Sequence, residues 1–303
     1  MAELKREIEQ TDIPGIERLL EQVFHDRAYA DLQRLGGMTN HSYKVTRADG
    51  QEYLVRLPGD GTEELINRFD ERKSTELACR LEIDAELLYF GDDGTKVMRF
   101  IENPQPMGEA VMRETDNIRK AAMLFHRLHT CGEDTGVRFE VFEMTESYEQ
   151  IIRAHDVSLY DDYPDIRQAV FQIKQETDAR FGTQRVPCHN DSLMGNWVLS
   201  GSGRLYLIDW EYSGMNNPMW DLACLSIEAD YTETEDNYLL EAYDGKRPDA
   251  DEAKRFVAHK LYVDLLWALW GKTRVPYDGD FMEEYARNRY ERLKRNLAGY
   301  RLL

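Results

Sequence analysis

Hydrophobic and polar positions follow two different periods along this chain, and each period dominates a different part of it. Apolar residues in "PGIERLLEQVF" recur at helical spacing, so the first 35 residues are predicted to be helical. Residues 43–47 and 53–57 alternate as strands do, and the Asp49-Gly50 pair between them is typical of a hairpin turn. The chain therefore opens with a helix followed by antiparallel strands.

A further helix and hairpin are predicted before the pattern changes. Residues 64–82 form a charged helical pattern, and "LLYFGDDGTKVMRFI" predicts a hairpin that turns at Asp93-Gly94. The two prolines of "ENPQP" (102–106) indicate a linker. Beyond it helices are expected at 115–131, 145–155, 163–181, 218–229, 234–243, 250–271 and 279–297. The one strand pair expected in this second part is a hairpin of residues 197–199 and 204–208, joined by "SGSG".

These elements predict an α+β fold with two lobes. A small antiparallel β-rich N-terminal lobe with one internal helix is expected over residues 1–101. Residues 102–106 form the hinge, and a larger, mostly helical C-terminal lobe occupies 107–303. The length of 303 residues suits such a division, and binding sites favour the cleft between lobes.

Composition narrows the class of partner. The chain has 38 Lys and Arg against 57 Asp and Glu, a formal charge of −19, and it contains no long basic run, so neither nucleic acid nor an anionic membrane is expected as a partner. The four cysteines are far apart, and no apolar stretch approaches the roughly 20 residues that span a bilayer. A cytosolic protein with free thiols and without membrane insertion is therefore expected.

Three oxygen-bearing side chains surround the ends of the predicted hairpin. Asn196 directly precedes its first strand, Asp209 follows its second, and Asp191 lies on the loop that leads into it. The turn brings Asn196 beside Asp209, and crowded carboxylates need a cation between them. Oxygen ligands with few His or Cys nearby favour Mg²⁺ over Zn²⁺.

The spacing also matches the catalytic layout of protein-kinase-like phosphotransferases, His-x-Asp-x-x-x-x-Asn followed by a strand and an Asp. In that layout Asp191 accepts or orients the proton of the substrate hydroxyl, while Asn196 and Asp209 hold Mg²⁺ on the nucleotide phosphates. His189, which opens the motif, is expected to support the loop rather than act as a base.

Upstream residues fit the same scheme. Gly36-Gly37 precede a strand, where glycines let backbone N–H groups approach phosphate. Arg56 on the next strand can reach the α- and β-phosphates, and it stays charged at any pH. Glu71 on the following helix is the expected partner of Arg56, with Glu76 as the alternative.

Four other residues have more than one interpretation. His126 and His129 have a spacing that can bind metal, but no third ligand is apparent and packing or a hydrogen bond to the catalytic loop is favoured. Asp221 is expected to accept hydrogen bonds from loop N–H groups rather than to bind metal. Glu211 is a candidate for support of the metal or for contact with substrate.

Taken together, these residues resemble the choline/ethanolamine kinase family, and within it the bacterial LicA type, in the aminoglycoside-phosphotransferase-like branch of the kinase fold. The matching stretches are "GGMTNHSYKV", "YLVRLPGDGTEELINRFDE", "RFIEN", "HNDSLMGN", "LIDWEYSGMNNPMWDLA" and "LWALW". The resemblance implies ATP as co-substrate and Mg²⁺ as metal. It implies ATP contacts from Gly37, Met38, Thr39, Asn40, Arg56 and Glu71, and adenine contacts from Arg99, Phe100 and Ile101.

The acceptor is expected to bind near Asp191. Trp267 and Trp270 share one helical face, and from their spacing alone core packing is favoured. The resemblance implies instead that both tryptophans and Tyr285 line a choline pocket, since aromatic faces bind quaternary ammonium groups. It also places Glu228 there, with Tyr231 and Tyr212 as further aromatic neighbours.

The expected activity is thus phosphorylation of choline to phosphocholine. Ethanolamine, thiamine and aminoglycosides are the alternative acceptors within the superfamily, and a pseudokinase that serves as a binding module is the alternative outside catalysis. Nothing in the sequence identifies a protein partner.

Overall fold

The computed structural model describes residues 8–35, 40–59, 66–105 and 107–301. The chain divides into two compact units, the first formed by Met1–Met107 with Gly195–Ser213 and the second by Gly108–Met194 with Gly214–Leu303. The break after Met107 falls next to the predicted linker. The inclusion of Gly195–Ser213 in the first unit was not expected, and the lobe boundaries predicted above stay a prediction.

The first unit is built on a five-stranded antiparallel sheet with strand order β1-β2-β3-β5-β4. Its strands are β1 (Asp31–Arg34), β2 (Asn40–Thr46), β3 (Glu52–Pro58), β4 (Leu87–Phe90) and β5 (Lys96–Arg99). The hairpin between β2 and β3 turns at Gly50, whose φ of 81° suits glycine. The expectation that the first 35 residues are helical was wrong for β1, a four-residue edge strand too short to reveal a period.

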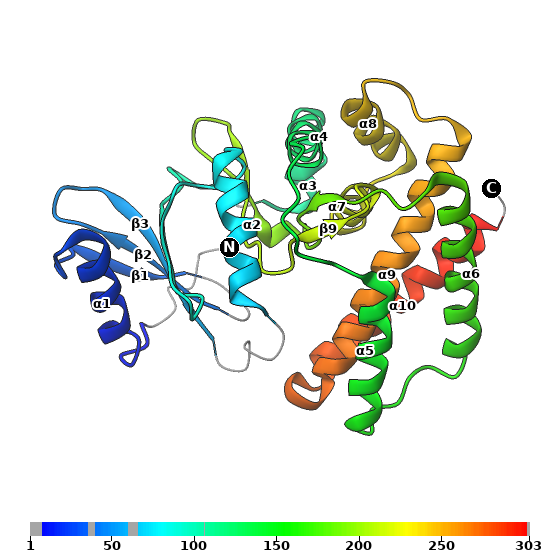
Figure 1. Cartoon of the computed structure of the whole chain (residues 1–303), viewed down its shortest axis with the longest axis horizontal. Coiled ribbons are helices and arrows are strands. Elements are labelled where there is room, and N and C mark those ends of the chain that lie inside the picture. Colours follow the sequence, from blue (N-terminus) through cyan, green and yellow to red (C-terminus); the bar gives the residue numbers. More distant parts are fainter. Residues whose placement is uncertain (1–7, 36–39, 60–65, 106, 302–303) are drawn as a thin grey trace. The chain divides into compact units, whose positions relative to one another are not determined.

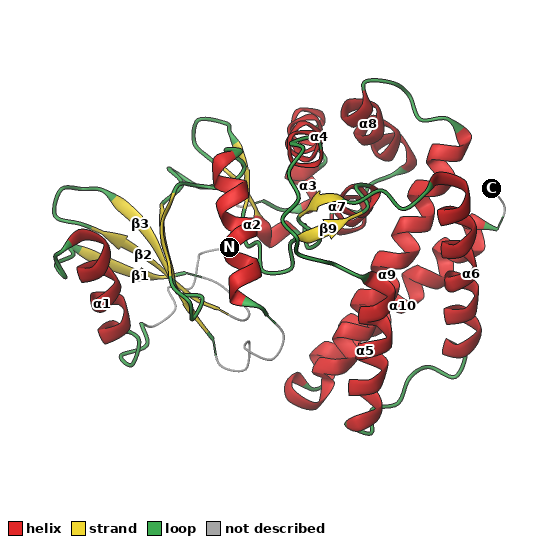
Figure 2. Cartoon of the chain, in the orientation of Figure 1, coloured by secondary structure: helices red, strands yellow, loops and turns green. Residues whose placement is uncertain are grey.

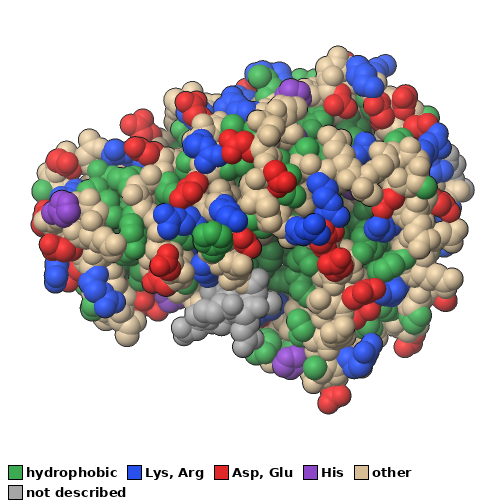
Figure 3. Space-filling view, viewed as in Figure 1, with side chains coloured by type: hydrophobic (Ala, Val, Ile, Leu, Met, Phe, Trp, Pro, Cys, Tyr) green, Lys and Arg blue, Asp and Glu red, His purple; other side chains and the backbone are tan. Residues whose placement is uncertain are grey.

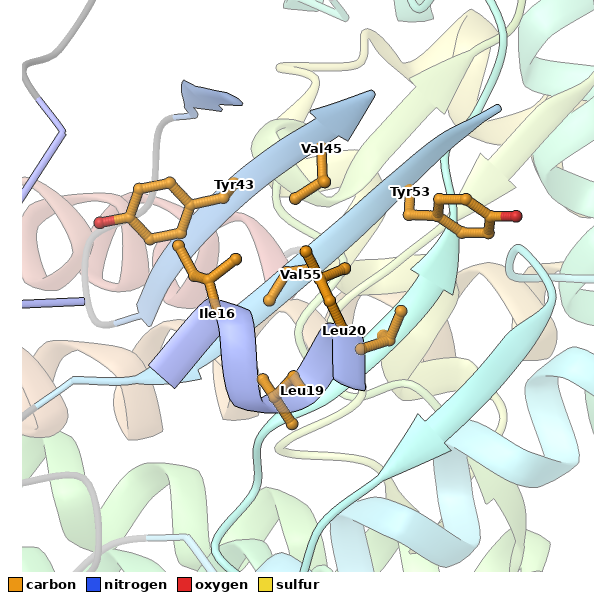
Figure 4. Close-up of a cluster of buried hydrophobic side chains, with 8 residues drawn as sticks. Ile16, Leu19, Leu20, Tyr43, Val45, Tyr53 and Val55 are labelled. Atoms are coloured by element: carbon orange, nitrogen blue, oxygen red, sulfur yellow. The ribbon is translucent and has the colours of Figure 1, made fainter. Parts of the chain in front are cut away.

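Helix α1 (Ile13–Phe24) covers one face of this sheet. It begins next to Pro14 and ends at His25, which has left-handed backbone geometry. Figure 4 shows its apolar side chains against alternate residues of β2 and β3. The buried set comprises Ile16, Leu19, Leu20, Tyr43, Val45, Tyr53, Val55 and Val97. Period 3.6 in the helix and period 2 in the strands thus produce one core.

Helix α2 (Arg68–Arg80) lies within the predicted range 64–82 and carries charge into the interior. The side chain of Asn67 caps its N-terminus by accepting the N–H groups of Phe69 and Asp70. The residues that α2 buries include Glu71, Ser74 and Thr75, so its inner face is partly polar. A buried carboxylate on this face requires cationic partners.

The predicted hairpin of the second part is present as β7 (Trp197–Leu199) and β8 (Leu205–Leu207), preceded by the short 3₁₀ turn Met194–Asn196. Backbone hydrogen bonds tie this ribbon to the first unit, from Leu207 N to Ile83 O (3.1 Å) and from Gly201 N to Glu102 O (3.0 Å). These bonds explain why the ribbon is grouped with the sheet.

The second unit is mostly helical, as Figure 2 shows. Its helices are α3 (Glu109–Met112), α4 (Thr115–His129), α5 (Val141–Ala154), α6 (Tyr163–Phe181), α7 (Met219–Glu228), α8 (Glu233–Asp244), α9 (Ala250–Asp278) and α10 (Asp280–Tyr300). Gly279, with φ 61°, separates α9 from α10. None of the described helices combines the length and apolarity needed to cross a lipid bilayer.

A further strand pair lies in the second unit, contrary to the expectation of a single hairpin after the linker. Strands β6 (Val186–Cys188) and β9 (Gly214–Asn216) pair antiparallel. Each has three residues, and Pro187, Gly214 and Asn216 are poor strand formers. Their pairing depends on contact between distant segments, which local pattern does not reveal.

On the molecular face of Figure 3, acidic and basic side chains are interspersed. On the face shown, acidic side chains are therefore not gathered into one patch.

Candidate active site

The first unit contains two buried cations directly opposite each other. Arg56 on β3 pairs in register with Lys96 on β5, and each side chain is 3 % exposed. Like charges at such positions repel unless a counter-charge lies between them. Glu71 of α2 supplies it, because its Oε1 contacts Arg56 Nη2 and lies 3.6 Å from Lys96 Nζ. Helix and sheet are thus joined by charge as well as by apolar packing.

Arg68 completes the surroundings of Glu71. Its Nη1 lies 2.7 Å from Glu71 Oε2. Burial alone would raise the pKa of Glu71, but the charges of Lys96, Arg56 and Arg68 outweigh it and hold that pKa below its usual value. Glu71 is therefore an anion shared by three cations.

The alternative partner Glu76 lies elsewhere. Its carboxylate forms an exposed pair with Arg72, at 2.9 Å, four residues earlier on the same helix. Of the two candidates, the structure therefore pairs Arg56 with Glu71, although the role predicted for this pair toward ATP stays a prediction.

Asp209 and Glu211 follow β8 and lie beside the same arginines. Asp209 Oδ1 is 3.3 Å from Arg56 Nη1, and Glu211 Oε2 is 3.7 Å from Arg68 Nη1. Asn40 donates its side-chain N–H to Glu211 Oε2 at 3.2 Å. Asp209 has φ 67°, a left-handed geometry uncommon outside glycine, so its carboxylate is presented by a strained turn.

Glu211 carries an unusual proton affinity. Burial and the negative charge of Asp209 raise its pKa to about 7, with Arg56 opposing. Carboxylate oxygens of Glu71, Asp209 and Glu211 all lie within 4.8 Å of one another. Because Glu71 is already held by cations, Asp209 and Glu211 are the pair whose repulsion a divalent ion would relieve.

Asn196 is brought to the same end of the ribbon. Its carbonyl oxygen accepts the N–H of Ile208 at 2.9 Å, which places it next to the residue before Asp209. Asn196 is buried. The hairpin thus unites the two predicted metal ligands along the chain, as expected from the turn, and the oxygen-only donor set of Asn196, Asp209 and Glu211 fits Mg²⁺.

The predicted nucleotide contacts are only partly within the described residues. Gly36, Gly37, Met38 and Thr39 lie outside them. Arg99 donates its backbone N–H to Glu86 O at 2.8 Å, and Phe100 to Glu52 O at 3.1 Å. Among the described residues, no acceptor is found for the backbone N–H of Ile101. The adenine contacts of Arg99, Phe100 and Ile101 stay predictions.

In the second unit, a buried carboxylate helps to hold the loop that carries Asp191. Asp221, in the first turn of α7, accepts the backbone N–H groups of His189 (2.8 Å) and Asn190 (2.7 Å). The N–H of Asp191 in turn donates to His189 Nδ1 at 3.2 Å. Asp191 itself is only half-buried. His189 and Asp221 therefore hold the loop, while Asp191 keeps access to solvent.

His129 extends this network. Its Nε2 lies 3.0 Å from Asp221 Oδ2, and its Nδ1 lies 2.9 Å from the hydroxyl of Tyr243. Cys188 is close enough to join His129 and Asp221 as a metal cluster, but burial raises the pKa of its thiol well above the usual value. A neutral thiol and a fully bonded imidazole favour hydrogen bonding over metal binding. His126 contacts the edge of the same tyrosine ring.

The predicted aromatic residues meet where α9 packs on α10. The rings of Trp267 and Trp270 have centroids 5.9 Å apart, and those of Trp270 and Tyr285 are 5.8 Å apart, both edge to face. We call these residues the aromatic corner. Gly271 permits their approach, since a Cβ at this position would lie 2.8 Å from Tyr285 Cδ1. Trp267 is buried, whereas Trp270 and Tyr285 are half-buried.

Arg289 and Glu228 adjoin the aromatic corner. Arg289 lies over the Tyr285 ring, with Cζ 4.7 Å from the centroid, and its Nη2 is 2.5 Å from Glu228 Oε1. Burial raises the pKa of Tyr285, Arg289 opposes this, and the charges of Glu228 and Asp191 add to the increase. Asp191, Glu228 and Tyr285 therefore interact electrostatically within one unit.

Two further residues predicted to contact substrate, Tyr231 and Tyr212, do not belong to the aromatic corner. Tyr231 is buried and donates its hydroxyl to Met112 O at 3.2 Å. Tyr212 belongs to the first unit, three residues after Asp209 along the chain. Their contacts with substrate stay predictions.

The fold is shared with a class of small-molecule kinases. An aminoglycoside 2′-phosphotransferase in its GDP complex superposes with a TM-score of 0.68 at 16 % identity, covering 96 % of this chain and 98 % of the other. At this identity the likeness concerns the fold alone.

The chain belongs to the choline/ethanolamine kinase family, whose sequence profile matches residues 33–267. The LicA protein of Haemophilus influenzae is 28 % identical over 293 residues, which cover 93 % of this chain and 83 % of that protein. The crystal structure of the choline kinase LicA from Streptococcus pneumoniae superposes with a TM-score of 0.80 at 32 % identity, covering 95 % of this chain and 99 % of the other. The predicted family and fold class are thus confirmed.

Proposed function

We propose that this protein transfers the terminal phosphoryl group of ATP to the hydroxyl of choline, with Mg²⁺, and yields phosphocholine and ADP. The observation that carries the choice of acceptor is the aromatic corner of Trp267, Trp270 and Tyr285. Aromatic faces attract a trimethylammonium group that cannot form hydrogen bonds, and tryptophan is the strongest of them. The choline kinase activity named for the pneumococcal LicA structure supports the same acceptor.

Asp191 acts on the acceptor hydroxyl. Its carboxylate accepts the hydroxyl proton as the oxygen forms a bond to the γ-phosphorus, and the bond from that phosphorus to the ADP oxygen breaks. Asp221 accepts hydrogen bonds from two amides of the loop and so keeps the Asp191 carboxylate in place. The conformational entropy of Asp191 is therefore reduced before the substrate binds. Its interaction with Tyr285 supports a position near the ammonium site.

The nucleotide is assigned to the first unit. Glu71 holds the guanidinium of Arg56, whose charge would attract the nucleotide phosphates. The related LicA structure with AMP, at 32 % identity and a TM-score of 0.78, supports nucleotide binding in this fold. Asn196, Asp209 and Glu211 would hold Mg²⁺, which neutralises phosphate charge when bound.

A panel of acceptors tests the proposal. Choline, ethanolamine, thiamine and kanamycin are compared at equal concentrations with Mg²⁺ and ATP, and phosphorylated products are identified by mass spectrometry. Choline is expected to give the highest kcat/KM. A folded protein that prefers thiamine or kanamycin would refute the assignment. A preference for ethanolamine would replace choline by ethanolamine as the acceptor.

The metal requirement is tested in the same assay. Excess EDTA is expected to abolish turnover and added Mg²⁺ to restore it. Full turnover in EDTA would contradict the roles given to Asn196, Asp209 and Glu211.

A further inference from the structure

A buried arginine lies beside a pocket that is proposed to bind a cation. Arg289 of α10 is 5 % exposed, and its guanidinium lies over the face of Tyr285. A second cation at this place repels the substrate unless its charge is balanced. Glu228 balances it, at 2.5 Å from Nη2.

The other carboxylate nearby is less available to Arg289. Asp264 accepts hydrogen bonds from Arg292 Nη2 at 2.7 Å and from Arg292 Nε at 2.9 and 3.2 Å, while its distance to Arg289 Nη1 is 3.6 Å. Within the described residues, Nε and Nη1 of Arg289 have no hydrogen-bond acceptor. The contact with Glu228 is therefore the main hydrogen bond of this guanidinium, and it is charge-assisted.

The ion pair with Arg289 reduces the number of free acceptor oxygens that Glu228 presents to a ligand. Its Oε1 is taken by Arg289, and its side chain is 16 % exposed. A primary ammonium brings three N–H donors that need acceptors once water is removed, as a lysine ammonium does. A trimethylammonium group has no N–H donor and needs only negative potential and aromatic faces. A carboxylate already bound to arginine serves the second ligand well and the first poorly.

We propose that Arg289 is a specificity-determining residue, which holds Glu228 and thereby favours quaternary over primary ammonium alcohols as acceptors. The inference rests on the proposed function, because it concerns the acceptor pocket of that reaction. It adds a residue that touches Glu228 and Tyr285 rather than the reacting atoms, so Arg289 acts as a positioning residue.

The test measures kcat/KM for choline and for ethanolamine in the native protein and in Arg289→Gln. Releasing Glu228 should strengthen binding of the primary ammonium more than that of choline. The ratio of choline to ethanolamine kcat/KM is expected to fall about tenfold, mainly through KM, with the KM for ATP unchanged. Arg289→Lys keeps a cation near Glu228 and should retain most of the native ratio.

Arg287→Gln is the matched control. It removes the same charge from the same helix at an exposed side chain, and the ratio should not change. An unchanged ratio in folded Arg289→Gln, or an equal change in Arg287→Gln, would overturn the inference.

A double variant keeps the inference testable if Arg289→Gln does not fold. Glu228→Gln/Arg289→Gln removes both charges together, which costs less stability than leaving one buried charge alone. If Arg289 acts through Glu228, the double variant and Glu228→Gln should have the same choline-to-ethanolamine ratio. Different ratios would refute the inference. Failure of the proposed function has another signature, namely a native protein that phosphorylates neither choline nor ethanolamine.

Discussion

The two units differ in how their candidate binding regions are built, one from buried ion pairs and the other from aromatic rings. In the first unit, a charge cluster of Arg56, Arg68, Glu71, Lys96, Asp209 and Glu211 links two strands, a helix and the ribbon by ion pairs. In the second unit, the aromatic corner consists of neutral rings, and Arg289 beside it pairs with Glu228 and lies 3.6 Å from Asp264. Phosphates and metal ions are bound by directed hydrogen-bond donors and oxygen ligands, whereas a quaternary ammonium group is bound by the faces of aromatic rings.

The difference also predicts how each region fails. Buried charges in the cluster share partners, so removing one leaves the others without compensation. The rings of the aromatic corner stabilise a bound ligand through their apolar area and their π-electrons. Removing one ring should therefore affect mainly the ligand that contacts it. Substitutions should therefore have wide effects in the charge cluster and narrow effects in the aromatic corner.

The largest effect is expected at Asp191, the proposed catalytic carboxylate. Asp191→Ala removes the group proposed to accept the hydroxyl proton, and kcat should fall by about 10²–10⁴-fold. Binding of ATP should persist, because the charge cluster is intact. Turnover and ATP affinity of the variant, measured side by side, check this separation. A folded variant with near-native turnover would remove Asp191 from the mechanism.

The charge cluster is tested at Glu71, which compensates three buried cations. Glu71→Gln should lower the free energy of unfolding by about 3–5 kcal/mol, as expected when one member of a buried ion-pair network is removed. The KM for ATP should rise as well, since Arg56 loses its support. Denaturant unfolding and ATP kinetics measure the two effects.

Glu76→Gln is the matched control for Glu71→Gln. It lies on the same helix and loses an exposed pair with Arg72, so its effect on unfolding should stay below about 0.5 kcal/mol. Equal destabilisation by the two substitutions would contradict the assignment of Glu71 as partner of Arg56.

Local pattern was sufficient for most of the fold. The hairpins, α1, α2 and the helices from α4 to α10 follow from hydrophobic period and turn residues, which act within a few positions. The four-residue α3 was not predicted. Strand β1 was missed because it is a short edge strand inside a stretch predicted to be helical, and β6 and β9 because their pairing depends on contact between distant segments. The range 250–271 also underestimated α9, which continues through Pro276 to Asp278.

The candidate site residues also divide into those that the sequence reveals and those that only the structure reveals. Asp191, Asn196 and Asp209 form a spaced motif, so the sequence alone points to them. Lys96 and Arg289 were missed because their partners, Glu71 and Glu228, lie on other elements, and Arg68 because an i, i+3 pair on a charged helix does not reveal that it is buried. The alternation of "KVMR" and the spacing of Arg289 four residues after Tyr285 were the available signals, and both are weak without a structure.

The aromatic corner should respond more narrowly. Trp270→Ala removes a ring from the proposed ammonium site, so the KM for choline should rise about tenfold while the KM for ATP stays nearly unchanged. Trp270→Phe should be milder. It also removes a buried indole N–H for which the described residues supply no acceptor, so no hydrogen bond is lost. Steady-state kinetics with thermal unfolding separates the two interpretations: if Trp270 is only core packing, the melting temperature falls and both substrates suffer alike.

The smallest effect is a pH dependence that belongs to the charge cluster alone. Burial and the charge of Asp209 raise the pKa of Glu211 from 4.5 to about 7. Between these values the folded protein keeps a proton that the unfolded chain has released, so stability should fall as pH rises through this window. Glu211→Gln removes that contribution. The drop in melting temperature from pH 5.5 to pH 8, measured in EDTA, should be about 2–4 °C smaller in Glu211→Gln than in the native protein. Mg²⁺ competes with the same proton, so it should stabilise the native protein more at pH 8 than at pH 6 and lose this dependence in the variant. Identical pH profiles for native protein and Glu211→Gln would show that Glu211 does not titrate in this range, whereas Glu76→Gln should retain the native profile.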